Sequence, residues 1–337
     1  MPDAPKPLDE YHRKRSLDRT PEPGGGASSS AGSLFVVQKH AATRTHYDFR
    51  LELDGVLKSW AVPKTPSYDT SVKRVAIHVE DHPVEYASFE GVIPEGNYGA
   101  GPVIVWDRGV WVPLKDPRQG LEEGKLLFEL RGYKLRGRWT LVKMKKTEKE
   151  WLLIKERDGL ESEDRTLPEA SILSGLTVEE LGEGHDPTGP IVEALDALDA
   201  PAGEVLASSV EPMLAESRDD AFSDPDWVFE LKYDGYRIIA GLEAGEARLI
   251  SRAGNDLTAS FPEVADALEA LPFDDLVVDG EVVVHDDRGV PSFQRLQQRA
   301  RLSRPLDIDR ATVELPATLY LFDCLGFHGR ELRGLPL

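Results

Sequence analysis

Apolar and polar residues alternate with a period of two through the first half of the chain, which is typical of strands that bury one face. Between residues 34 and 157 this pattern recurs in eight short runs: SLFVVQKH, HYDFRLEL, VLKSWAV, RVAIHVE, PVIVWDRG, KLLFELRG, GRWTLVKM and EWLLIKER. The runs are separated by turn signals such as DG, GNYGAG, EEG and RGYKLRG. Since almost no helical periodicity interrupts them, the sequence predicts a closed β-barrel or a sandwich.

Two of these runs gather unusual polar residues on one face. In THYDFRLEL the two faces of a strand would hold Tyr47, Phe49, Leu51 and Leu53 on one side and His46, Asp48, Arg50 and Glu52 on the other. In KRVAIHVEDH they would hold Val75, Ile77 and Val79 on one side and Arg74, His78, Glu80 and His82 on the other. A solvated stripe would explain either pattern. Solvated faces favour Lys, Glu and Thr, however, whereas these faces carry His, Asp and Arg, so a chemical site is the competing interpretation.

The polar face of the first run contains a candidate metal site. His46 and Asp48, two residues apart on a strand, can reach one cation from the same side, and His40 could be the third ligand. Two imidazoles and a carboxylate suit Mn, Zn or Fe and leave positions open for substrate. Arg50, together with His82, would suit a bound phosphate, because a guanidinium binds phosphate oxygens bidentately.

The rest of the chain suggests two mobile stretches and a second module. Residues 1–33 combine a basic cluster with the tract PEPGGGASSSAGS and predict a flexible basic arm. Residues 158–211 are rich in acidic and small residues with scattered prolines, and predict a flexible acidic linker. Short helices at TVEELGE or IVEALDAL are the alternative there. The expected domains are therefore residues 34–157 and residues 212–337.

Charge and composition narrow the class of protein. The 337 residues carry a net charge of -20, which taken whole argues against a nucleic-acid partner. Residues 1–157, however, hold 26 basic and 22 acidic residues, a net +4, while residues 158–211 hold one basic and 14 acidic residues, a net -13. The net charge of the whole chain thus conceals a first module whose positive charge is suited to binding a polyanion. The absence of a long apolar run and the single cysteine, Cys324, predict a cytoplasmic protein with no membrane segment.

The first module resembles a known family. FVVQKHAATRTHYDFRLELDGVLKSWAVPK and VEDHPVEYASFEGVIPEGNYGAGPVIVWDRG look like the 3'-phosphoesterase module of bacterial and archaeal ligase D, and the match covers most of residues 11–157. The resemblance implies a small β-barrel that uses Mn2+ or another divalent transition metal to remove 3'-ribonucleosides and 3'-phosphates from DNA ends. The metal ligands that it implies are His40, His46 and Asp48.

The same resemblance implies roles for further residues. Phosphate and transition-state contacts would come from Arg50, His82, Gln38, Arg15 and Glu22, with Lys64 as a weaker member of the set. Tyr86 and Arg74 match positions important for the reaction. One departure is that the family usually has Arg-Asp where this chain has Arg15-Ser16, with Asp18 two residues later.

The second module resembles the adenylation domain of ATP-dependent DNA ligases from about Val210 to Leu337. The motifs, in order, are EPMLA, KYDGYR at residues 232–237, LISRAGNDLT, LVVDGEVVVHDDRGVPSFQRLQQR and LYLFDCLGFHGREL. An α+β, ATP-grasp-like domain of antiparallel sheets and helices, using ATP and Mg2+, is implied. Lys232 would be the nucleophile that forms lysyl-AMP, since a shielded lysine can be deprotonated near neutral pH. The other implied ATP contacts are Glu230, Arg237, Arg252, Glu281 and Phe322.

Such ligases continue to an E-G-x-x-x-K element and a later lysine pair, neither of which follows Phe322 before Leu337. We therefore expect this second domain to be partial. The favoured hypothesis is a DNA end-processing enzyme of double-strand break repair by non-homologous end joining. The alternatives are a ligase completed by a second chain and a non-catalytic DNA-docking scaffold. Expected partners are DNA 3' ends, ATP, a Ku-like end-binding protein and a separate ligase or polymerase chain, with a nucleoid-associated location.

Overall fold

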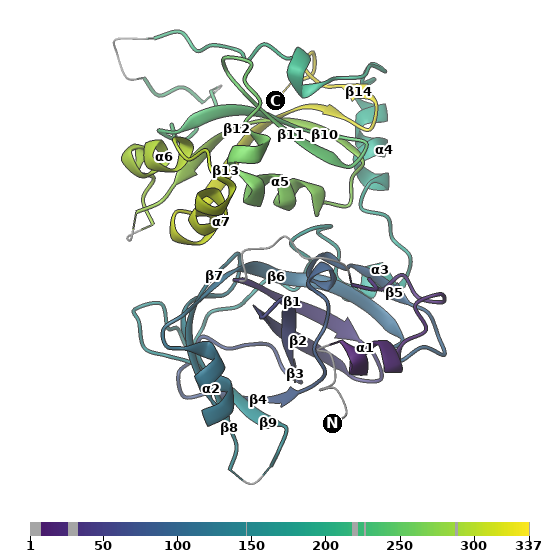
Figure 1. Ribbon diagram of the computed structural model, residues 1–337. Coiled ribbons are helices and arrows are strands. Elements are labelled where there is room, and N and C mark those ends of the chain that lie inside the picture. Colours follow the sequence, from purple (N-terminus) through teal and green to yellow (C-terminus); the bar gives the residue numbers. More distant parts are fainter. Residues whose placement is uncertain are drawn as a thin grey trace. The chain divides into compact units, whose positions relative to one another are not determined.

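The computed structural model describes residues 8–25, 33–145, 147–217, 222–225, 227–286 and 289–336. It divides into two compact units, Met1–Pro187 and Thr188–Leu337, and strands dominate both (Figure 1). The fold class expected from the sequence, mainly β with an added α+β part, is confirmed. No helix in the described ranges is long and apolar enough to span a membrane.

The first unit is built around a closed antiparallel barrel. Its strands are β1 (Leu34–Ala41), β2 (Thr45–Leu53), β3 (Val56–Val62), β4 (Lys73–His78), β5 (Gly91–Ile93), β6 (Gly101–Pro113), β7 (Lys125–Gly132), β8 (Arg136–Lys143) and β9 (Glu150–Lys155). They follow the order β1-β2-β3-β4-β9-β8-β7-β6, and pairing of β1 with β6 closes the ring. Strand β5 adds to the first residues of β6. The eight sequence runs match the eight barrel strands.

Aromatic side chains fill the interior of the barrel. Trp60, Trp106, Trp139, Phe49 and Phe128 are each fully buried and belong to one apolar cluster. An interior packed in this way excludes solvent, so polar chemistry is left to the outer face of the wall.

The apolar residues of strand β4 face outward, not into the core as their alternation suggests. Val75 and Ile77 are 41% and 38% exposed on its outer face, whereas Ala76 is buried. His78 lies on the buried side, where its ring centroid is 5.2 Å from that of Trp60. The core takes a small residue and a histidine here because the neighbouring Trp60 already occupies the space.

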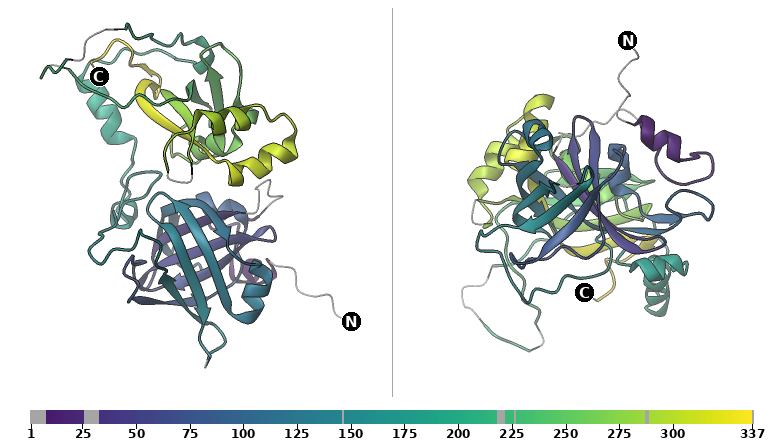
Figure 2. Two further views of the ribbon diagram at one scale, coloured as in Figure 1. Left: turned by 90° about the vertical axis from the view of Figure 1, so that its left-hand side faces the viewer. Right: turned by 90° about the horizontal axis from the view of Figure 1, so that it is seen from below.

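The N-terminal segment is packed onto the barrel, which corrects the prediction of a flexible arm for its described part. Helix α1 (Asp9–Lys14) lies outside the ring of strands (Figures 1 and 2). Tyr11 on this helix is fully buried, in an outer cluster with Tyr86 of the 3-10 helix η1 (Val84–Ser88). Burial of one aromatic side chain stabilises by about 2 kcal/mol, enough to hold a short segment. Residues 1–7 and 26–32, with most of the Gly/Ser tract, lie outside the described residues.

The acidic stretch also differs from the flexible linker that was expected. Residues 158–187 belong to the first unit, where Leu167 joins the barrel core and the Ile172 N–H donates to Val105 O at 3.0 Å. Helix α3 (Val178–Gly182) begins with a capping box formed by Thr177 and Glu180. The remaining residues, with α4 (Gly189–Ala197) and η2 (Ala207–Ser209), belong to the second unit. The two short helices that were the alternative at the sequence level are thus both present.

The second unit is an antiparallel sheet with helices. The strands β10 (Tyr236–Glu243), β11 (Glu246–Ser251), β12 (Asp275–Val284), β13 (Ala317–Phe327) and β14 (Arg330–Glu331) have the order β11-β10-β12-β13-β14. The remaining elements are η3 (Thr258–Ser260), α5 (Pro262–Glu269), α6 (Phe293–Ala300) and α7 (Pro305–Glu314), and, in the first unit, α2 (Pro117–Glu123). The apolar residues before Lys232 form no strand, and pairing in the described sheet begins at Tyr236, opposite Val282.

Candidate active site

The register of β1 and β2 gathers three candidate metal ligands on the outer wall of the barrel. His40 lies opposite His46, and Gln38 lies opposite Asp48. His40, His46 and Asp48 each offer a ligand atom within 4.8 Å of the others. Alternation within β2 puts Tyr47 and Phe49 in the core and leaves His46 and Asp48 on this face. The cluster thus arises from local strand geometry plus one cross-strand pairing.

Each imidazole turns one ring nitrogen towards the cluster and the other towards a backbone carbonyl. His40 Nε2 lies 2.7 Å from Gly99 O, and His46 Nδ1 lies 2.9 Å from Arg44 O. Because a carbonyl oxygen can only accept, these nitrogens carry the protons. In the neutral ring, the form that binds a metal, the lone pairs are on His40 Nδ1, 3.8 Å from Asp48 Oδ2, and on His46 Nε2, 3.6 Å from Asp48 Oδ1. Backbone carbonyls that fix the tautomer in this way are typical neighbours of metal-binding histidines, so these residues fit a divalent transition metal.

Arg50 is the buried cation beside this cluster. Its guanidinium donates to Asp48 Oδ2 at 3.0 Å, to Gln38 Oε1 at 3.0 Å and to Ser59 Oγ at 2.8 Å. Burial opposes ionisation of Asp48, but Arg50 and then the two histidines hold the pKa of this carboxyl well below its usual range. Asp48 is therefore a carboxylate at any physiological pH, ready to bind a cation.

Gln38 supports Arg50 rather than offering donors to a ligand. Its side-chain amide donates to the backbone oxygens of Tyr86 and Phe89 at 3.0 and 2.9 Å, while its oxygen accepts from Arg50. Both ends of the amide are thus engaged in this structure. A direct phosphate contact, as the family resemblance implied, would require these bonds to break.

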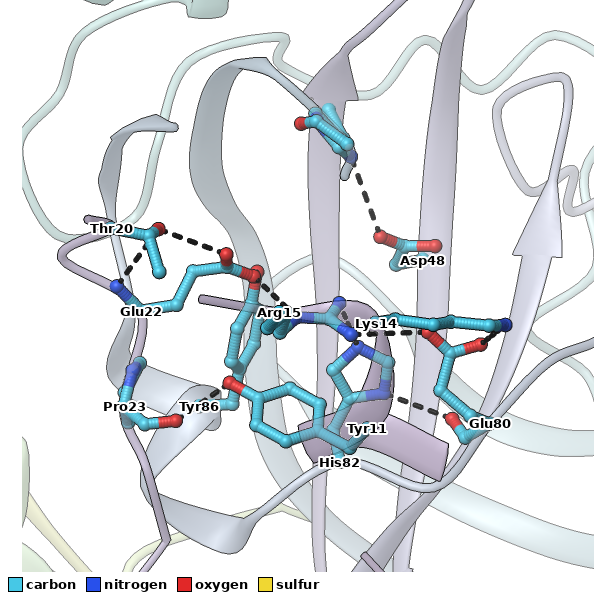
Figure 3. A network of polar contacts seen from close by, with 12 residues as sticks. Tyr11, Lys14, Arg15, Thr20, Glu22, Pro23, Asp48, Glu80, His82 and Tyr86 are labelled. Atoms are coloured by element: carbon cyan, nitrogen blue, oxygen red, sulfur yellow. Dashed lines mark hydrogen bonds and ion pairs between the residues drawn. The ribbon is translucent and has the colours of Figure 1, made fainter. Parts of the chain in front are cut away.

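A second cation enters the site from the N-terminal segment. Arg15 lies between Glu22 and Glu80, donating from Nε to Glu22 at 2.8 Å and from Nη1 to Glu80 at 3.2 Å (Figure 3). Its Nη2 lies 3.0 Å from His82 Nε2. The Tyr86 hydroxyl donates to Glu22 at 2.9 Å, and Lys14 Nζ donates to Glu80 at 2.9 Å. These bonds join residues 14–22 to the barrel wall.

Burial and neighbouring charges decide the ionisation of this network. Burial, and then the guanidinium groups of Arg50 and Arg15, lower the pKa of His82 well below its usual value. Its Nδ1 donates to Glu80 O at 2.9 Å, so the neutral ring accepts from Arg15 at Nε2. Burial raises the pKa of Tyr86 well above its ordinary value, and Glu22 adds to the effect. Tyr86 therefore stays a hydrogen-bond donor.

Two of the expected residues stand apart from these contacts. Arg74 on β4 donates from Nε to Thr65 O at 2.8 Å, and Lys64 is exposed after the end of β3. Within the described residues, neither contacts the network of Arg15, Arg50 and His82.

The structure adds residues that the sequence did not single out. Ser59 is fully buried and accepts from Arg50, with its oxygen 3.4 Å from His82 Nδ1. The ring of Tyr11 lies 5.1 Å from that of His82 and 4.1 Å from the Arg15 guanidinium. Ser59 had one detectable signal, a small polar residue within a predicted strand, between Lys58 and Trp60. Tyr11 had none, because its contact with the distant His82 follows only from the fold.

The second unit brings together some of the expected ATP contacts. Arg237 donates to Asp279 at 3.0 and 2.6 Å, and its guanidinium lies 5.3 Å from the ring centre of Phe322. The Arg252 N–H donates to Arg237 O at 3.2 Å. These residues share one end of the sheet formed by β10, β12 and β13.

Lys232 and Glu230 lie in an exposed stretch without regular structure. Glu281 accepts from the Gly235 N–H at 3.0 Å, which holds the end of this stretch near the sheet. Burial raises the pKa of Glu281, with Lys232 and Arg237 opposing the change. The described residues therefore place Lys232 near Glu281 without enclosing it.

Comparison with known proteins finds one matching domain family within each of the two units. Residues 38–143 match the family model of the DNA ligase D 3'-phosphoesterase domain, and residues 212–337 match that of the ATP-dependent DNA ligase domain. A multifunctional non-homologous end joining protein LigD from Pseudomonas aeruginosa is 44% identical over the whole chain, which covers 40% of that protein. A LigD protein from Mycobacterium tuberculosis is 37% identical over 97% of the chain and 36% of its own length.

A DNA ligase from Methanothermobacter thermautotrophicus is 40% identical over 38% of this chain and 23% of its own length. The chain thus spans about two fifths of the LigD proteins that it matches.

Proposed function

The chain belongs to the DNA ligase D family, with a 3'-phosphoesterase domain followed by an ATP-dependent DNA ligase domain, and from this we propose that its first unit heals DNA 3' ends. The reaction is the metal-dependent removal of 3'-ribonucleosides and 3'-phosphates, which leaves a 3'-hydroxyl for joining in double-strand break repair. The observation that carries the proposal is the placement of His40, His46 and Asp48 beside the buried guanidinium of Arg50.

His40 Nδ1, His46 Nε2 and an Asp48 oxygen would hold Mn2+ or another divalent transition metal. A bound ion would polarise the phosphate and lower the pKa of a water molecule. Arg50 supplies a fixed positive charge next to the reacting phosphate, because its three hydrogen bonds prevent it from swinging away. Preorganised charge of this kind needs no rearrangement when negative charge develops.

Arg15 would bind the phosphate from the other side, clamped by Glu22 and Glu80. His82 acts in this scheme as a positioning residue, since its neutral ring accepts from Arg15 and carries no charge of its own. Tyr86 has a similar role toward Glu22. In this scheme His82, Glu22 and Gln38 position the two arginines and do not make the direct phosphate contacts that the family resemblance implied. Arg74 and Lys64 would contact DNA further from the scissile bond.

The test is a primer-template assay with 3'-phosphate and 3'-ribonucleoside ends, with Mn2+ and with EDTA. We expect Mn2+-dependent trimming by the wild type and its loss in His46→Ala. His185→Ala is the matched control, because His185 is an exposed histidine of the same unit. A folded wild-type protein that leaves both ends unchanged would exclude the function. Full activity of His46→Ala would instead show that the cluster of His40, His46 and Asp48 is not the site of the reaction, and a wild type that binds these primers without trimming them would favour a DNA-docking scaffold.

The second unit carries a second proposal, formation of lysyl-AMP at Lys232 with ATP and Mg2+. The gathering of Arg237, Arg252, Glu281 and Phe322 at one end of its sheet supports this. The exposure of Lys232 indicates that further elements, from a longer chain or a partner, complete strand joining. DNA ends and ATP are the expected ligands, with a Ku-like end-binding protein as a further partner at the nucleoid.

The chain offers a sharp test of adenylation. Lys232 is the single lysine in residues 158–337, so a label from ATP on a fragment from this region must lie there. Label that disappears in Lys232→Ala and stays in the control Lys145→Ala would support the proposal. Label that persists in Lys232→Ala would contradict it.

A further inference from the structure

One aromatic side chain at the edge of the cation network is half exposed. Tyr98 lies in the loop between β5 and β6, and 51% of its surface is accessible. Lys14 Nζ lies 5.2 Å from the centre of its ring, and the Arg15 guanidinium carbon lies 5.5 Å from it. Both distances are within the range of cation–π attraction. The ring therefore borders Arg15, one of the two cations that we assign to phosphate binding.

The loop that carries Tyr98 is anchored at the metal cluster. The carbonyl oxygen of the next residue, Gly99, accepts from His40 Nε2 at 2.7 Å. At Gly101, the first residue of β6, φ is +136° and a side chain would collide with the carbonyl oxygen of Ala41, so the loop ends directly against the end of β1. A displacement of the loop would thus also disturb His40.

The same loop is tied to the N-terminal segment. Asn97 Nδ2 donates to Pro94 O at 3.1 Å and to Arg19 O at 3.4 Å. Tyr98 is therefore held between a metal ligand on one side and the Arg15 segment on the other, without being covered by either.

Other aromatic residues near the network cannot reach a ligand. Tyr11 and Tyr86 contact Arg15 or Arg50 but are 0% and 2% exposed. Tyr98 combines contact with the cations and an accessible ring. An exposed aromatic ring beside phosphate-binding cations is the pairing that proteins use to bind a nucleotide, because the cations take the phosphate and the ring stacks on the base.

We propose that Tyr98 stacks on the base of the 3'-terminal nucleoside while Arg15 and Arg50 hold the adjacent phosphate. This inference rests on the proposed phosphoesterase function and names the residue that recognises the nucleoside. Every base offers a π face, so the contact favours a nucleoside over a bare sugar without selecting one base.

The experiment compares two primers that differ only in the base. One ends in a 3'-ribonucleoside, and the other ends in the same ribose without a base. For Tyr98→Ala we expect KM to rise about 5- to 100-fold on the first primer, as loss of one stacking contact implies, with kcat little changed. On the baseless primer we expect no change. Tyr98→Phe keeps the ring and should behave as the wild type on both.

Tyr133→Ala is the matched control, because Tyr133 is 77% exposed and in the same unit. We expect it to leave KM unchanged on both primers. An unchanged KM for Tyr98→Ala on the base-bearing primer, or an equal rise on both primers, would overturn the inference.

A binding measurement separates this inference from the proposed activity. A primer with 2-aminopurine as its terminal base, bound to the metal-free protein, should lose fluorescence with the wild type and Tyr98→Phe but not with Tyr98→Ala. Quenching that depends on Tyr98 supports stacking even if no metal gives cleavage. Cleavage with quenching that is indifferent to Tyr98 would leave the activity standing and reject the stacking role.

Discussion

His82 shows how a single buried residue can link this site to pH. Its ring accepts from one arginine and lies close to a second, so protonation would place three positive charges together. The folded protein therefore resists a proton that the unfolded chain takes up below a pKa of about 6.5. A group whose folded pKa is depressed below its unfolded value in this way destabilises the fold as the pH falls through that unfolded value.

We accordingly expect the free energy of unfolding of the metal-free first unit to fall by about 1 kcal/mol between pH 7 and pH 5.5 on account of His82. His82→Gln should remove this part of the decline, since its amide oxygen can still accept from Arg15. Urea unfolding followed by tryptophan fluorescence measures the difference. His185→Gln, at an exposed site, is the control and should keep the wild-type slope. Equal slopes for wild type and His82→Gln would show that His82 is protonated normally.

At this scale the sequence predicts local neighbours and misses distant ones. His46, Asp48 and Arg50 follow from alternation on one strand, and His40 from the pairing across one turn. The contact between Arg15 and Glu80 joins residues 65 apart, and no periodicity in the sequence points to it. The neutral state of His82 likewise follows from burial between two cations, a property of the folded network.

At the scale of elements, the segment of residues 8–25 brings Arg15 to the site, although its regular structure is limited to the short helix α1. Helix α1, the buried Tyr11 and the bonds of Lys14, Arg15 and Glu22 attach it to the outer wall. Tyr11 donates from its hydroxyl to Pro23 O at 2.6 Å, which closes the segment into a loop around Arg15. Its attachment therefore depends on few residues.

Tyr11→Ala should release this segment while the barrel stays folded, because Tyr11 lies outside the interior cluster. We expect a loss of about 3 kcal/mol in docking free energy, as for other buried aromatic truncations. Trypsin cleavage after Arg13, Arg15 or Arg19 should then become faster, and trimming of 3' ends should fall while Mn2+ binding persists. Unchanged cleavage rates would contradict this anchoring role. Tyr133→Ala again serves as the control.

Prediction from sequence worked well for strands whose apolar residues face a core. All eight barrel strands coincide with runs of alternating residues, although β4 turns its apolar residues outward. In the described part of the first unit, the three-residue β5 was missed. Apolar residues do not suffice for a strand, since those before Lys232 meet no partner strand in the described sheet. An apolar pattern indicates that residues tend to be buried, whereas a strand also requires a neighbouring strand to pair with.

On the scale of the whole molecule, the boundary between the units lies in the middle of the acidic stretch. Composition alone suggested a linker from residue 158 to residue 211, because small and acidic residues rarely form a core. The structure divides this stretch at residue 187 and packs the first part onto the barrel. Lys134, almost fully buried, donates to the backbone oxygens of Pro168 and Ala170 at 2.9 and 2.5 Å.

A fragment ending at Arg157 should consequently be less stable than one ending at Pro187. It would lose the acceptors of Lys134, the buried side chain of Leu167 and the Lys155–Asp158 ion pair. The loss of buried partners of this kind amounts to about 3 kcal/mol or more. Thermal unfolding of the two fragments, with the full chain as reference, measures it. Identical melting temperatures would mean that residues 158–187 do not contribute to the stability of the barrel.

Strand β2 contributes to the barrel core with one face and to the candidate site with the other, which limits how its sequence can change. Residues with odd numbers, such as Tyr47 and Phe49, fill the barrel, and residues with even numbers, such as His46 and Asp48, form the site on the outside. An insertion or deletion of one residue inside this strand would exchange the two sets, exposing the aromatic rings and burying the ligands. Point substitutions can therefore alter either fold or chemistry separately, whereas a single-codon change of length would abolish both at once.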